Sequence, residues 1–379
     1  MMTEMTTRQL LVRSGGRCAL CFRDLMTSPT TFKDLYLGER AHIVGRSTAP
    51  RSPRGGGSLP VEARDDLENL MLLCGTCHDD ADHKVNVGVL TVELLRDRKD
   101  RHERHIAEVL SIQPSSATSV LRMTGLIGES GVSISPSTAA TSVLSSGRVA
   151  TFPWGRQSDS SEIDLTDLPG PEPSNASYYE ASARKIHQFF DRQFTPAVED
   201  GSVSHLSVFA LARWPLLVLL GAKVGDKIEA DVYQRHRTTE NWDWPADGKD
   251  TRFEWAKEAG AGADDAVLVL SLSAAVDVSE APGHLQGLLT YRIAPPVGVT
   301  PNYHVVGTPA ALKSAEAAFR GVLADIERHA KHVRRLHVIG AAPQSVCVAL
   351  GRSLTLGVHP QLVLYDRADG SYRAALEVN

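Results

Sequence analysis

Four cysteines near the start of the chain are spaced as two pairs that could hold a metal ion. Cys18 and Cys21 form one Cys-x-x-Cys pair, and Cys74 and Cys77 form the other. Each pair places two thiolates on a tight turn, and two such turns supply the four soft ligands of a tetrahedral Zn²⁺ site. A site closed by four thiolates leaves no position for water. We therefore expect this zinc to stabilise the fold rather than to perform chemistry.

A histidine, an asparagine and a second histidine run through the same stretch. His42 and Asn69 lie between the two cysteine pairs, and His78 directly follows Cys77. A neutral imidazole near pH 7 can take a proton from an attacking water molecule, and a cation such as Mg²⁺ can polarise a phosphodiester. If Cys77 opens a helix, Asp82 lies on the same face as His78 and could join it as a metal ligand.

The sequence around these residues resembles that of HNH endonucleases of the ββα-metal type. The resemblance implies that His42 is the general base, that Asn69 braces the loop carrying it, and that His78 binds a catalytic divalent cation. Many of these nucleases carry an acidic metal ligand where this chain has Ala41, so the second ligand stays open. The motifs that carry the resemblance are Ala41-His42-Ile43-Val44-Gly45, Ser52-Pro53-Arg54-Gly55, the run from Asn69 to His78, and Val92-Glu93-Leu94-Leu95.

Three arginines beside the predicted base suit contact with DNA phosphates. Arg46, Arg51 and Arg54 lie close to a glycine-rich loop, and guanidinium groups pair with phosphate oxygens in bidentate fashion. The net charge of −5 provides no overall attraction to nucleic acid, so such a local patch would have to bind the DNA. No helix that reads bases is recognisable, which predicts cleavage largely independent of sequence. A solvated loop with incidental arginines is the alternative.

Composition and periodicity divide the chain into three parts. Residues 1–110 form the zinc-stapled α+β domain, with a helix over 91–110, and residues 111–177, rich in Ser, Thr, Gly and Pro, form a connector with short strands possible. Residues 178–379 alternate apolar β-branched runs with helical periodicity, which predicts an α/β domain with a largely parallel sheet. Its expected helices cover 178–194, 214–224, 309–332 and 343–355, and its expected strands cover 205–210, 228–234, 266–272, 335–340 and 361–366.

Two stretches of this α/β domain are similar to each other. Residues 205–221 align with residues 335–351 at an offset of 130, and Tyr233-Gln-Arg235 then aligns with Tyr365-Asp-Arg367 after a two-residue insertion. Each stretch reads as strand, loop, helix and strand, so we interpret the pair as a duplicated Rossmann-like unit. Chance similarity between two α/β units is the alternative.

A crevice beyond the carboxyl ends of these strands is the expected ligand site. Helix N-termini there present free N–H groups to phosphate, and the loops 210–214 and 340–345 follow the equivalent first strands. We therefore expect a phosphate-bearing ligand in this crevice. Its candidate contacts are Arg213, Trp214, Pro343, Gln344 and Ser345.

Residues from about 170 to 379 resemble the SAVED domain. The stretches that carry the resemblance are 203–244, with its Phe209-Ala-Leu-Ala-Arg-Trp-Pro215 and Gln234-Arg-His-Arg237, and 340–366. The resemblance implies paired CARF-like Rossmann units that bind a cyclic oligonucleotide. A nucleotide ring needs stacking faces and phosphate partners, and the candidates are Tyr233, Arg235, Arg237, Trp242 and Trp244. The alternative for each aromatic residue is that its side chain packs in the core or at its rim and does not contact a ligand.

Together, the two resemblances imply an HNH-SAVED effector of bacterial CBASS anti-phage defence. We expect a DNA endonuclease that a cyclic di- or trinucleotide activates to degrade double-stranded DNA. Cutting both strands with a single-site module predicts a homo-oligomer. The alternatives are a constitutive restriction-type nuclease that recognises modified DNA, and a zinc-ribbon DNA-binding regulator without enzymatic activity. The bases, ring size and linkage of the nucleotide depend on pocket shape and are not predicted.

Three features of the sequence lead us to expect a protein of the cytoplasm that does not contact the membrane. The sequence Met1-Met2-Thr3-Glu4 lacks the basic-then-apolar order of a secretory signal, and the longest apolar run, near residues 214–222, is too short to span a bilayer. Clustered cysteines are read as metal ligands in a reducing compartment. The fifth, Cys347, lies in an apolar helix and is expected to be a core thiol.

Overall fold

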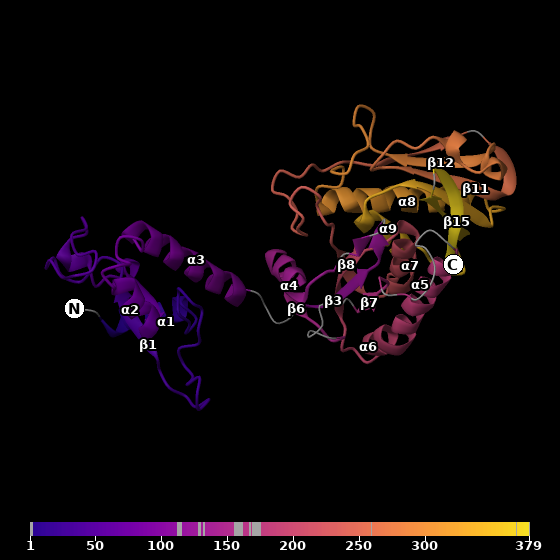
Figure 1. The fold of residues 1–379 in the computed structure, drawn as a ribbon. Coiled ribbons are helices and arrows are strands. Elements are labelled where there is room, and N and C mark those ends of the chain that lie inside the picture. The colour runs from indigo at the N-terminus through magenta and orange to yellow at the C-terminus, as the bar shows by residue number, and fades with distance from the viewer. Residues whose placement is uncertain are drawn as a thin grey trace. The chain divides into compact units, whose positions relative to one another are not determined.

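In the computed structural model the chain divides into two compact units, Met1–Gln113 and Pro114–Asn379, and each is described by itself (Figure 1). The structure describes residues 3–111, 116–127, 130–131, 133–154, 162–166, 168, 176–258, 260–368 and 370–378. Among these residues, no helix combines the length and the apolar character needed to cross a bilayer.

The first unit is built around a short antiparallel hairpin followed by a helix. Strand β1 (Gly38–His42) pairs with β2 (Leu70–Cys74) so that His42 lies opposite Leu70, and α2 (Gly75–Asp82) follows β2 without a loop. All five residues of β2 are buried, because the strand packs against both α2 and α1. The remaining elements are α1 (Glu4–Arg13), the 3-10 turns η1 (Val61–Ala63) and η2 (Leu67–Asn69), and α3 (Val92–Ser111).

The second unit contains two main sheets whose central strands repeat one arrangement. One sheet has the order β6-β3-β8-β9, and the other contains the order β12-β11-β13-β14. If the four strands of each set are numbered along the chain, the order across both sheets is 2-1-3-4. All of these neighbours are parallel. The first four are β3 (Ala117–Thr124), β6 (Val149–Thr151), β8 (His205–Leu211) and β9 (Glu229–Val232); the second four are β11 (Ala261–Ser271), β12 (Leu288–Ala294), β13 (Arg335–Ala341) and β14 (Gln361–Ala368). This repeated order supports the predicted duplication.

Shorter strands complete the sheets, and helices cover their faces. Strands β10 (Glu254–Glu258) and β15 (Ser371–Val378) add antiparallel edges to the second sheet, and β7 (Ile163–Asp164) pairs with β3. A separate small hairpin joins β4 (Leu126–Ile127) and β5 (Ser130–Gly131). The helices are α4 (Pro136–Ser145), α5 (Ala176–Phe189), the π-helical turn η4 (Phe190–Phe194), α6 (Thr195–Glu199), α7 (Trp214–Val224), α8 (Pro309–His329) and α9 (Gln344–Arg352), with short turns η5 (Val278–Glu280) and η6 (Gly283–Leu285).

Helices α7 and α9 pack against each other at two equivalent glycines. A Cβ atom built on Gly221 would lie 2.0 Å from the carbonyl oxygen of Val348, and one built on Gly351 would lie 2.0 Å from that of Val218. These four residues are pairwise equivalent at the offset of 130 found in the sequence. The contact is therefore reciprocal, as expected for two repeats related by a local twofold axis.

The expectation of a connector over residues 111–177 is corrected by this fold. Strand β3 lies inside that stretch, pairs with β6, β7 and β8, and has seven buried residues out of eight. It is the first strand of the first repeat, the counterpart of β11. The adjacent Thr118 and Ser119 made this strand look like a polar linker in the sequence. In the structure their hydroxyl groups are buried and form hydrogen bonds, such as that between Thr118 and Ser207.

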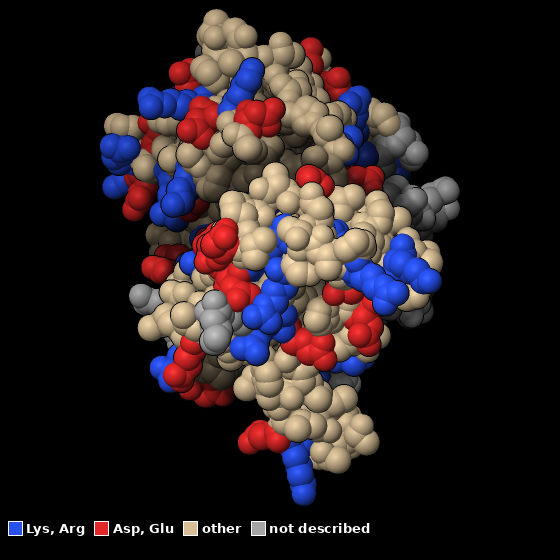
Figure 2. Space-filling model, turned by 90° about the vertical axis from the view of Figure 1, so that its left-hand side faces the viewer, with Lys and Arg blue, Asp and Glu red and all other residues tan. Residues whose placement is uncertain are grey.

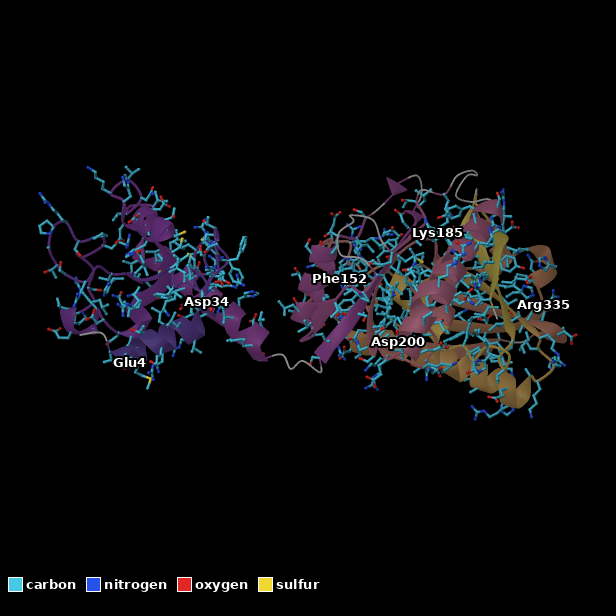
Figure 3. The ribbon with its side chains drawn as sticks, turned by 90° about the horizontal axis from the view of Figure 1, so that it is seen from below. Glu4, Asp34, Phe152, Lys185, Asp200 and Arg335 are labelled. Carbon is cyan, nitrogen blue, oxygen red and sulfur yellow. The ribbon has the colours of Figure 1, made fainter. Side chains whose placement is uncertain are left out.

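Most other element predictions agree with the structure apart from their ends. The helix expected over 214–224 is confirmed as α7, while the helix expected over 178–194 is interrupted by the π-helical turn η4. Apolar side chains fill the space between helices and sheets, whereas charged side chains such as Glu4, Asp200 and Arg335 lie at the surface of their units (Figure 3). On the face in Figure 2, the basic and acidic side chains of the described residues lie interspersed.

Candidate functional site

The four predicted cysteine ligands converge in the first unit. The sulfur atoms of Cys18, Cys21, Cys74 and Cys77 all lie within 4.8 Å of one another, and those of Cys21 and Cys74 are 3.8 Å apart. A Zn–S bond of about 2.3 Å in a tetrahedron gives sulfur atoms about 3.8 Å apart, so the geometry and the donor type fit a metal ion. Burial and hydrogen bonds from neighbouring thiols raise the pKa of Cys77, whereas hydrogen bonds from backbone groups lower the pKa of Cys18 against the effect of burial.

Asn69 holds the segment that follows His42. Its side-chain oxygen accepts a hydrogen bond from the backbone N–H of Val44 at 2.8 Å, and its amide group donates to the carbonyl oxygens of Val44 and Arg64 at 2.9 Å each. The side chain is buried, so all of these hydrogen bonds are protected from water. This geometry is the bracing that the sequence resemblance implies for Asn69.

His42 lies at the end of β1, at the edge of a groove. The groove has a volume of about 800 Å³, and its polar lining includes Glu39, Arg40, His42, Arg46 and Asp65. The Nε2 atom of His42 is 3.0 Å from a carboxylate oxygen of Asp65. The Asp65 carboxylate thus fixes the orientation of the His42 ring at the edge of the groove, a place from which an imidazole can accept a proton.

His78 lies on α2 between two carboxylates. Its Nδ1 atom is 2.6 Å from Glu39 of β1, and its Nε2 atom is 3.5 Å from Asp82, one helical turn along α2. Hydrogen bonding to Asp82 and Glu39 raises the pKa of His78 to about 9 against the opposing effect of burial. The two carboxylates lie at opposite nitrogens of the ring, so Glu39 orients His78 through Nδ1 while Nε2 faces Asp82. Among the described residues, the group of side chains already close enough together to hold a metal ion is that of the four cysteines.

Glu39 was missed by the sequence reasoning, which considered as acidic ligands only Asp82 and the position before His42. The register of β1 against β2 pairs Gly38 with Cys74, which brings Glu39 beside the first turn of α2. A Cβ atom on Gly75 would lie 3.2 Å from the carboxylate of Glu39. No local sequence pattern encodes this register.

The three predicted DNA-binding arginines have different surroundings. Arg46 has an exposed side chain near the groove and lies 3.7 Å from Asp65, and Arg51 is exposed. The expectation for Arg54 is corrected, because its side chain is only 5% exposed. It donates to the carbonyl oxygens of Ile43 and Ala81 and to the carboxylate of Asp82. Arg54 therefore joins the loop to α2 and is not available to DNA.

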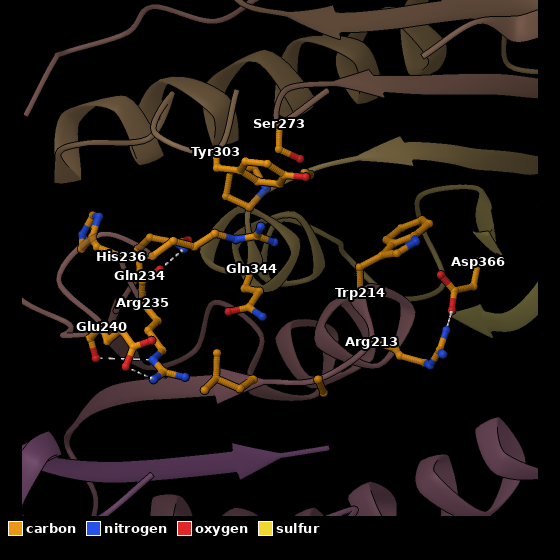
Figure 4. Close-up of a pocket in the computed structure, with 15 residues that line it drawn as sticks. Arg213, Trp214, Gln234, Arg235, His236, Glu240, Ser273, Tyr303, Gln344 and Asp366 are labelled. Atoms are coloured by element: carbon orange, nitrogen blue, oxygen red, sulfur yellow. Dashed lines mark hydrogen bonds and ion pairs between the residues drawn. The ribbon is translucent and has the colours of Figure 1, made fainter. Parts of the chain in front are cut away.

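A cleft of about 670 Å³ in the second unit lies at the carboxyl ends of the strands of both repeats (Figure 4). Its walls come from the segments after β8, β9, β13 and β14, which is the crevice expected from the sequence. Six of the ten predicted ligand residues line it: Arg213, Trp214, Arg235, Arg237, Pro343 and Gln344. Lining residues that the prediction did not include are Leu211, Ala212, Gln234, His236, Glu240, Ser273, Tyr303, Ala342 and Asp366.

The predicted stacking role of Tyr233 and Trp242 is corrected, because both side chains belong to a core cluster. The ring of Phe209 stacks on Tyr233 at 4.2 Å between centroids and meets Trp242 edge-on at 5.1 Å. The Tyr233 hydroxyl group is hydrogen-bonded to Ser146. Burial leaves neither ring with a face for a ligand. Trp244 packs against His236 behind the cleft wall.

Tyr303 supplies an aromatic face that the sequence reasoning did not consider. It lies in the loop between β12 and α8, and the guanidinium group of Arg237 lies 3.8 Å from the centre of its ring. A partly exposed ring beside an arginine can stack on a base while the arginine meets a phosphate.

Two cross-braces join the repeats beside the cleft. Arg213, the N-cap residue of α7, donates to Asp366 at the end of β14 at 2.5 Å, and the Tyr179 hydroxyl group donates to the same carboxylate. In the equivalent place, Gln234 at the end of β9 accepts from the backbone and hydroxyl groups of Ser345 at the start of α9. Ser345 is thus buried and engaged with the other repeat. In the sequence, Gln234 aligns with Asp366, and these two residues each form one of the two cross-braces.

Two nitrogen atoms at the cleft are buried without a partner among the described residues. They are Nε of Arg213 and Nε2 of His236. Burial, followed by the neighbouring His304, lowers the pKa of His236, so its ring is neutral at pH 7. Unsatisfied donors or acceptors of this kind mark places where a ligand or water completes the hydrogen bonding.

Comparison with known families gives the class of the second unit. Residues 186–378 match the family model of SAVED, the SMODS-associated and fused to various effectors sensor domain. The match extends over just over half of the 379 residues, and the chain belongs to the SAVED family. The second unit is therefore a sensor domain with an α/β fold. No curated protein matches the chain.

Solved structures similar to this chain include Cap4 SAVED/CARF-domain containing receptors. The receptor of Acinetobacter baumannii with the cyclic trinucleotide 3'3'3'-cAAA has 15% sequence identity and a TM-score of 0.46, over 76% of this chain and 61% of that one. The receptor of Moraxella osloensis has 14% identity and a TM-score of 0.38, over 86% of this chain and 71% of that one. The chain thus spans about three-fifths of the Acinetobacter receptor.

Proposed function

We propose that this chain is an effector endonuclease that cuts double-stranded DNA when its SAVED unit binds a cyclic oligonucleotide. The observation that carries the proposal is the placement of His42, Asn69 and His78 on one strand–strand–helix unit in the same chain as a SAVED sensor domain. The family description itself joins this sensor to various effectors. The HNH resemblance of the first unit supplies an effector of the required kind.

In the nuclease unit, the proposed roles follow from the hydrogen bonds of each side chain. His42 takes a proton from the attacking water, and Asn69 keeps its segment in place. His78, through Nε2, and Asp82 would hold a divalent cation such as Mg²⁺, which would polarise the phosphodiester and stabilise the leaving oxygen, while Glu39 orients His78 through Nδ1. The four cysteines would hold a structural Zn²⁺ that fixes β2 and α2 relative to the turn that carries Cys18 and Cys21.

In the sensor unit, the cleft suits an anionic ligand that carries bases. Arg235 and Arg237 offer positive charge, and Trp214 and Tyr303 offer aromatic surface. Two solved Acinetobacter receptors hold the cyclic trinucleotides 3'3'3'-cAAA and 2'3'3'-cAAA. We infer a cyclic di- or trinucleotide for this chain. Binding would drive self-association in the cytoplasm and bring two nuclease units to one duplex, because each unit cuts a single strand.

A plasmid cleavage assay tests the proposal. Purified full-length protein is incubated with supercoiled plasmid and Mg²⁺, alone and with a panel that includes both cyclic trinucleotides and several cyclic dinucleotides. We expect linear and fragmented DNA only with one class of nucleotide, no cleavage by His42→Ala, and unchanged cleavage by His105→Ala. His105 is an exposed histidine on α3 and serves as the matched control.

Other outcomes of this assay would favour one of the two alternative functions given by the sequence. Cleavage that ignores every nucleotide and depends on DNA modification would favour a restriction-type nuclease. DNA binding without cleavage under all conditions would favour a zinc-ribbon regulator. Light scattering on the same samples reports whether the activating nucleotide raises the oligomeric state.

A further inference from the structure

The carboxylate of Asp65 contacts the imidazole of His42. Its Oδ1 atom lies 3.0 Å from Nε2 of His42, and both side chains are more than four-fifths buried. Arg46 approaches the same carboxylate at 3.7 Å. The carboxylate therefore has a histidine on one side and an arginine on the other, at the edge of the groove that both His42 and Asp65 line.

The pair is held by a single buried amide. Asn69 hydrogen-bonds to both backbone groups of Val44, two residues after His42, and donates to the carbonyl oxygen of Arg64, the residue before Asp65. Arg64 is itself buried and donates to carbonyl oxygens of the glycine-rich loop. One side chain thus fixes the segment of the histidine and the segment of the aspartate relative to each other.

We propose that Asp65 is a positioning residue that selects the tautomer of His42. A carboxylate accepts hydrogen bonds and cannot donate them, so Nε2 of His42 carries the hydrogen and Nδ1 keeps its lone pair. Hydrogen bonding from His42 lowers the pKa of Asp65, so the carboxyl group stays ionised near neutral pH. The inference rests on the proposed nuclease function, and it assigns to Asp65 a role that the sequence motifs did not suggest.

The proposed proton transfer can be followed atom by atom. An O–H bond of the attacking water breaks, and its hydrogen forms a bond to Nδ1 of His42. The water oxygen bonds to phosphorus, the bond from phosphorus to the leaving sugar oxygen breaks, and that oxygen takes a proton from solvent. The resulting imidazolium carries its positive charge against the carboxylate of Asp65.

The test compares Asp65→Asn with Asp66→Asn. Asp66 is the next residue, carries an exposed side chain, and loses the same charge in the variant. An asparagine at 65 can turn its NH₂ group toward Nε2, which favours the wrong tautomer. We expect Asp65→Asn to slow single-turnover cleavage by at least about 100-fold, less than the ~10⁴ known for the equivalent change in a serine protease triad. Asp66→Asn should stay within about twofold, as surface changes do.

A spectroscopic measurement separates this inference from the nuclease proposal. Nitrogen-15 NMR of histidine-labelled full-length protein, with His42 assigned by its loss in His42→Ala, reports which nitrogen carries the hydrogen. We expect the Nε2–H form in the wild type and in Asp66→Asn, and a shift toward Nδ1–H in Asp65→Asn. An unchanged tautomer in Asp65→Asn would overturn the inference. A wild type that never cuts DNA would instead overturn the nuclease function, and the tautomer would still decide the role of Asp65.

Discussion

Glu39 is the residue on which the proposed catalytic metal site most depends. Its carboxylate faces Nδ1 of His78 at 2.6 Å, from the strand that carries His42. Glu39→Gln removes one negative charge and the carboxylate that fixes Nδ1 of His78, so that Nε2 is no longer held as the metal-binding nitrogen, while leaving a side chain of the same size. We expect the affinity for Mn²⁺, measured by calorimetry on the full chain, to fall at least about tenfold.

The matched control for this change is Glu68→Gln, in the 3-10 turn η2 before β2. Glu68 is exposed and lies in a different element from Glu39, His78 and Asp82. Its substitution should leave Mn²⁺ affinity unchanged. Equal effects of the two substitutions would show that Glu39 acts only through the general charge of the unit.

The cysteine cluster predicts that one thiol decides the stability of the first unit. Cys77→Ser replaces a soft ligand, so we expect loss of one bound zinc per chain, measured by elemental analysis, and unfolding of the first unit, because structural zinc binding is worth on the order of 10 kcal/mol. Cys347→Ser is the control. Cys347 is fully buried in α9 of the second unit and lies outside the group of four cysteines, so it is a core thiol. Zinc retained in full by Cys77→Ser would contradict the proposed ligand set.

At the scale of elements, the reciprocal contact of α7 and α9 predicts equal sensitivity at two distant positions. Gly221→Ala and Gly351→Ala each place a methyl group 2.0 Å from a carbonyl oxygen of the facing helix. Overpacking of this kind costs about 1–3 kcal/mol or more. Urea unfolding followed by tryptophan fluorescence should show similar losses for both.

Gly283→Ala is the control for the helix contact. Gly283 lies in the turn η6 of the same unit, and a Cβ atom there meets nothing within 4 Å. Its substitution should change the free energy of unfolding by less than about 0.5 kcal/mol. A cost confined to Gly221 alone would argue against the twofold relation of the repeats.

The cross-brace between Arg213 and Asp366 predicts an effect on ligand affinity. Asp366 neutralises an arginine in the cleft and places a negative charge where an anionic ligand would bind. Asp366→Asn should therefore raise the affinity for the activating cyclic nucleotide about tenfold, since a charged hydrogen bond is worth about 1.5–3 kcal/mol. Calorimetry measures this change. Asp226→Asn, an exposed carboxylate beyond the other end of α7, should leave affinity unaltered.

At the scale of the whole molecule, buried histidines predict how stability depends on pH. His337 in β13 is 5% exposed and hydrogen-bonded to Tyr365, with His284, Asp265 and Arg335 around it. Burial lowers its pKa below the ordinary value of 6.5, more than Asp265 raises it. Below pH 6.5 the unfolded chain therefore binds a proton that the folded chain does not, and stability falls as the pH falls.

His337→Gln should flatten this dependence by up to about 1.4 kcal/mol per pH unit, the limit for one proton. Urea unfolding at pH 7.5, 6.5 and 5.5 measures it. His329→Gln on α8, with a side chain 63% exposed, is the control and should keep the wild-type slope. A wild-type stability that is flat from pH 7.5 to 5.5 would contradict the prediction.

The predicted architecture of the second unit was correct where periodicity is strong and incomplete where it is weak. The apolar helix α7 and the apolar strands β8 and β13 show clear patterns, so all three were predicted almost in full. Strand β3 was missed because Thr118 and Ser119 imitate a polar linker until a neighbouring strand satisfies their hydroxyl groups. A first strand was nevertheless implied by the duplication, since β11 has no other counterpart.

Residue types and short spacings determined the chemistry that this chain carries: two cysteine pairs, His42, Asn69 and His78, and the repeat that places a crevice after β8 and β13. Only the tertiary structure decided which of these groups meet. It brings Glu39 to His78, Asp65 to His42 and Asp366 to Arg213, buries Tyr233 and Trp242, and turns Arg54 inward. Strand register and helix packing join residues far apart in the chain, and local patterns do not encode those contacts.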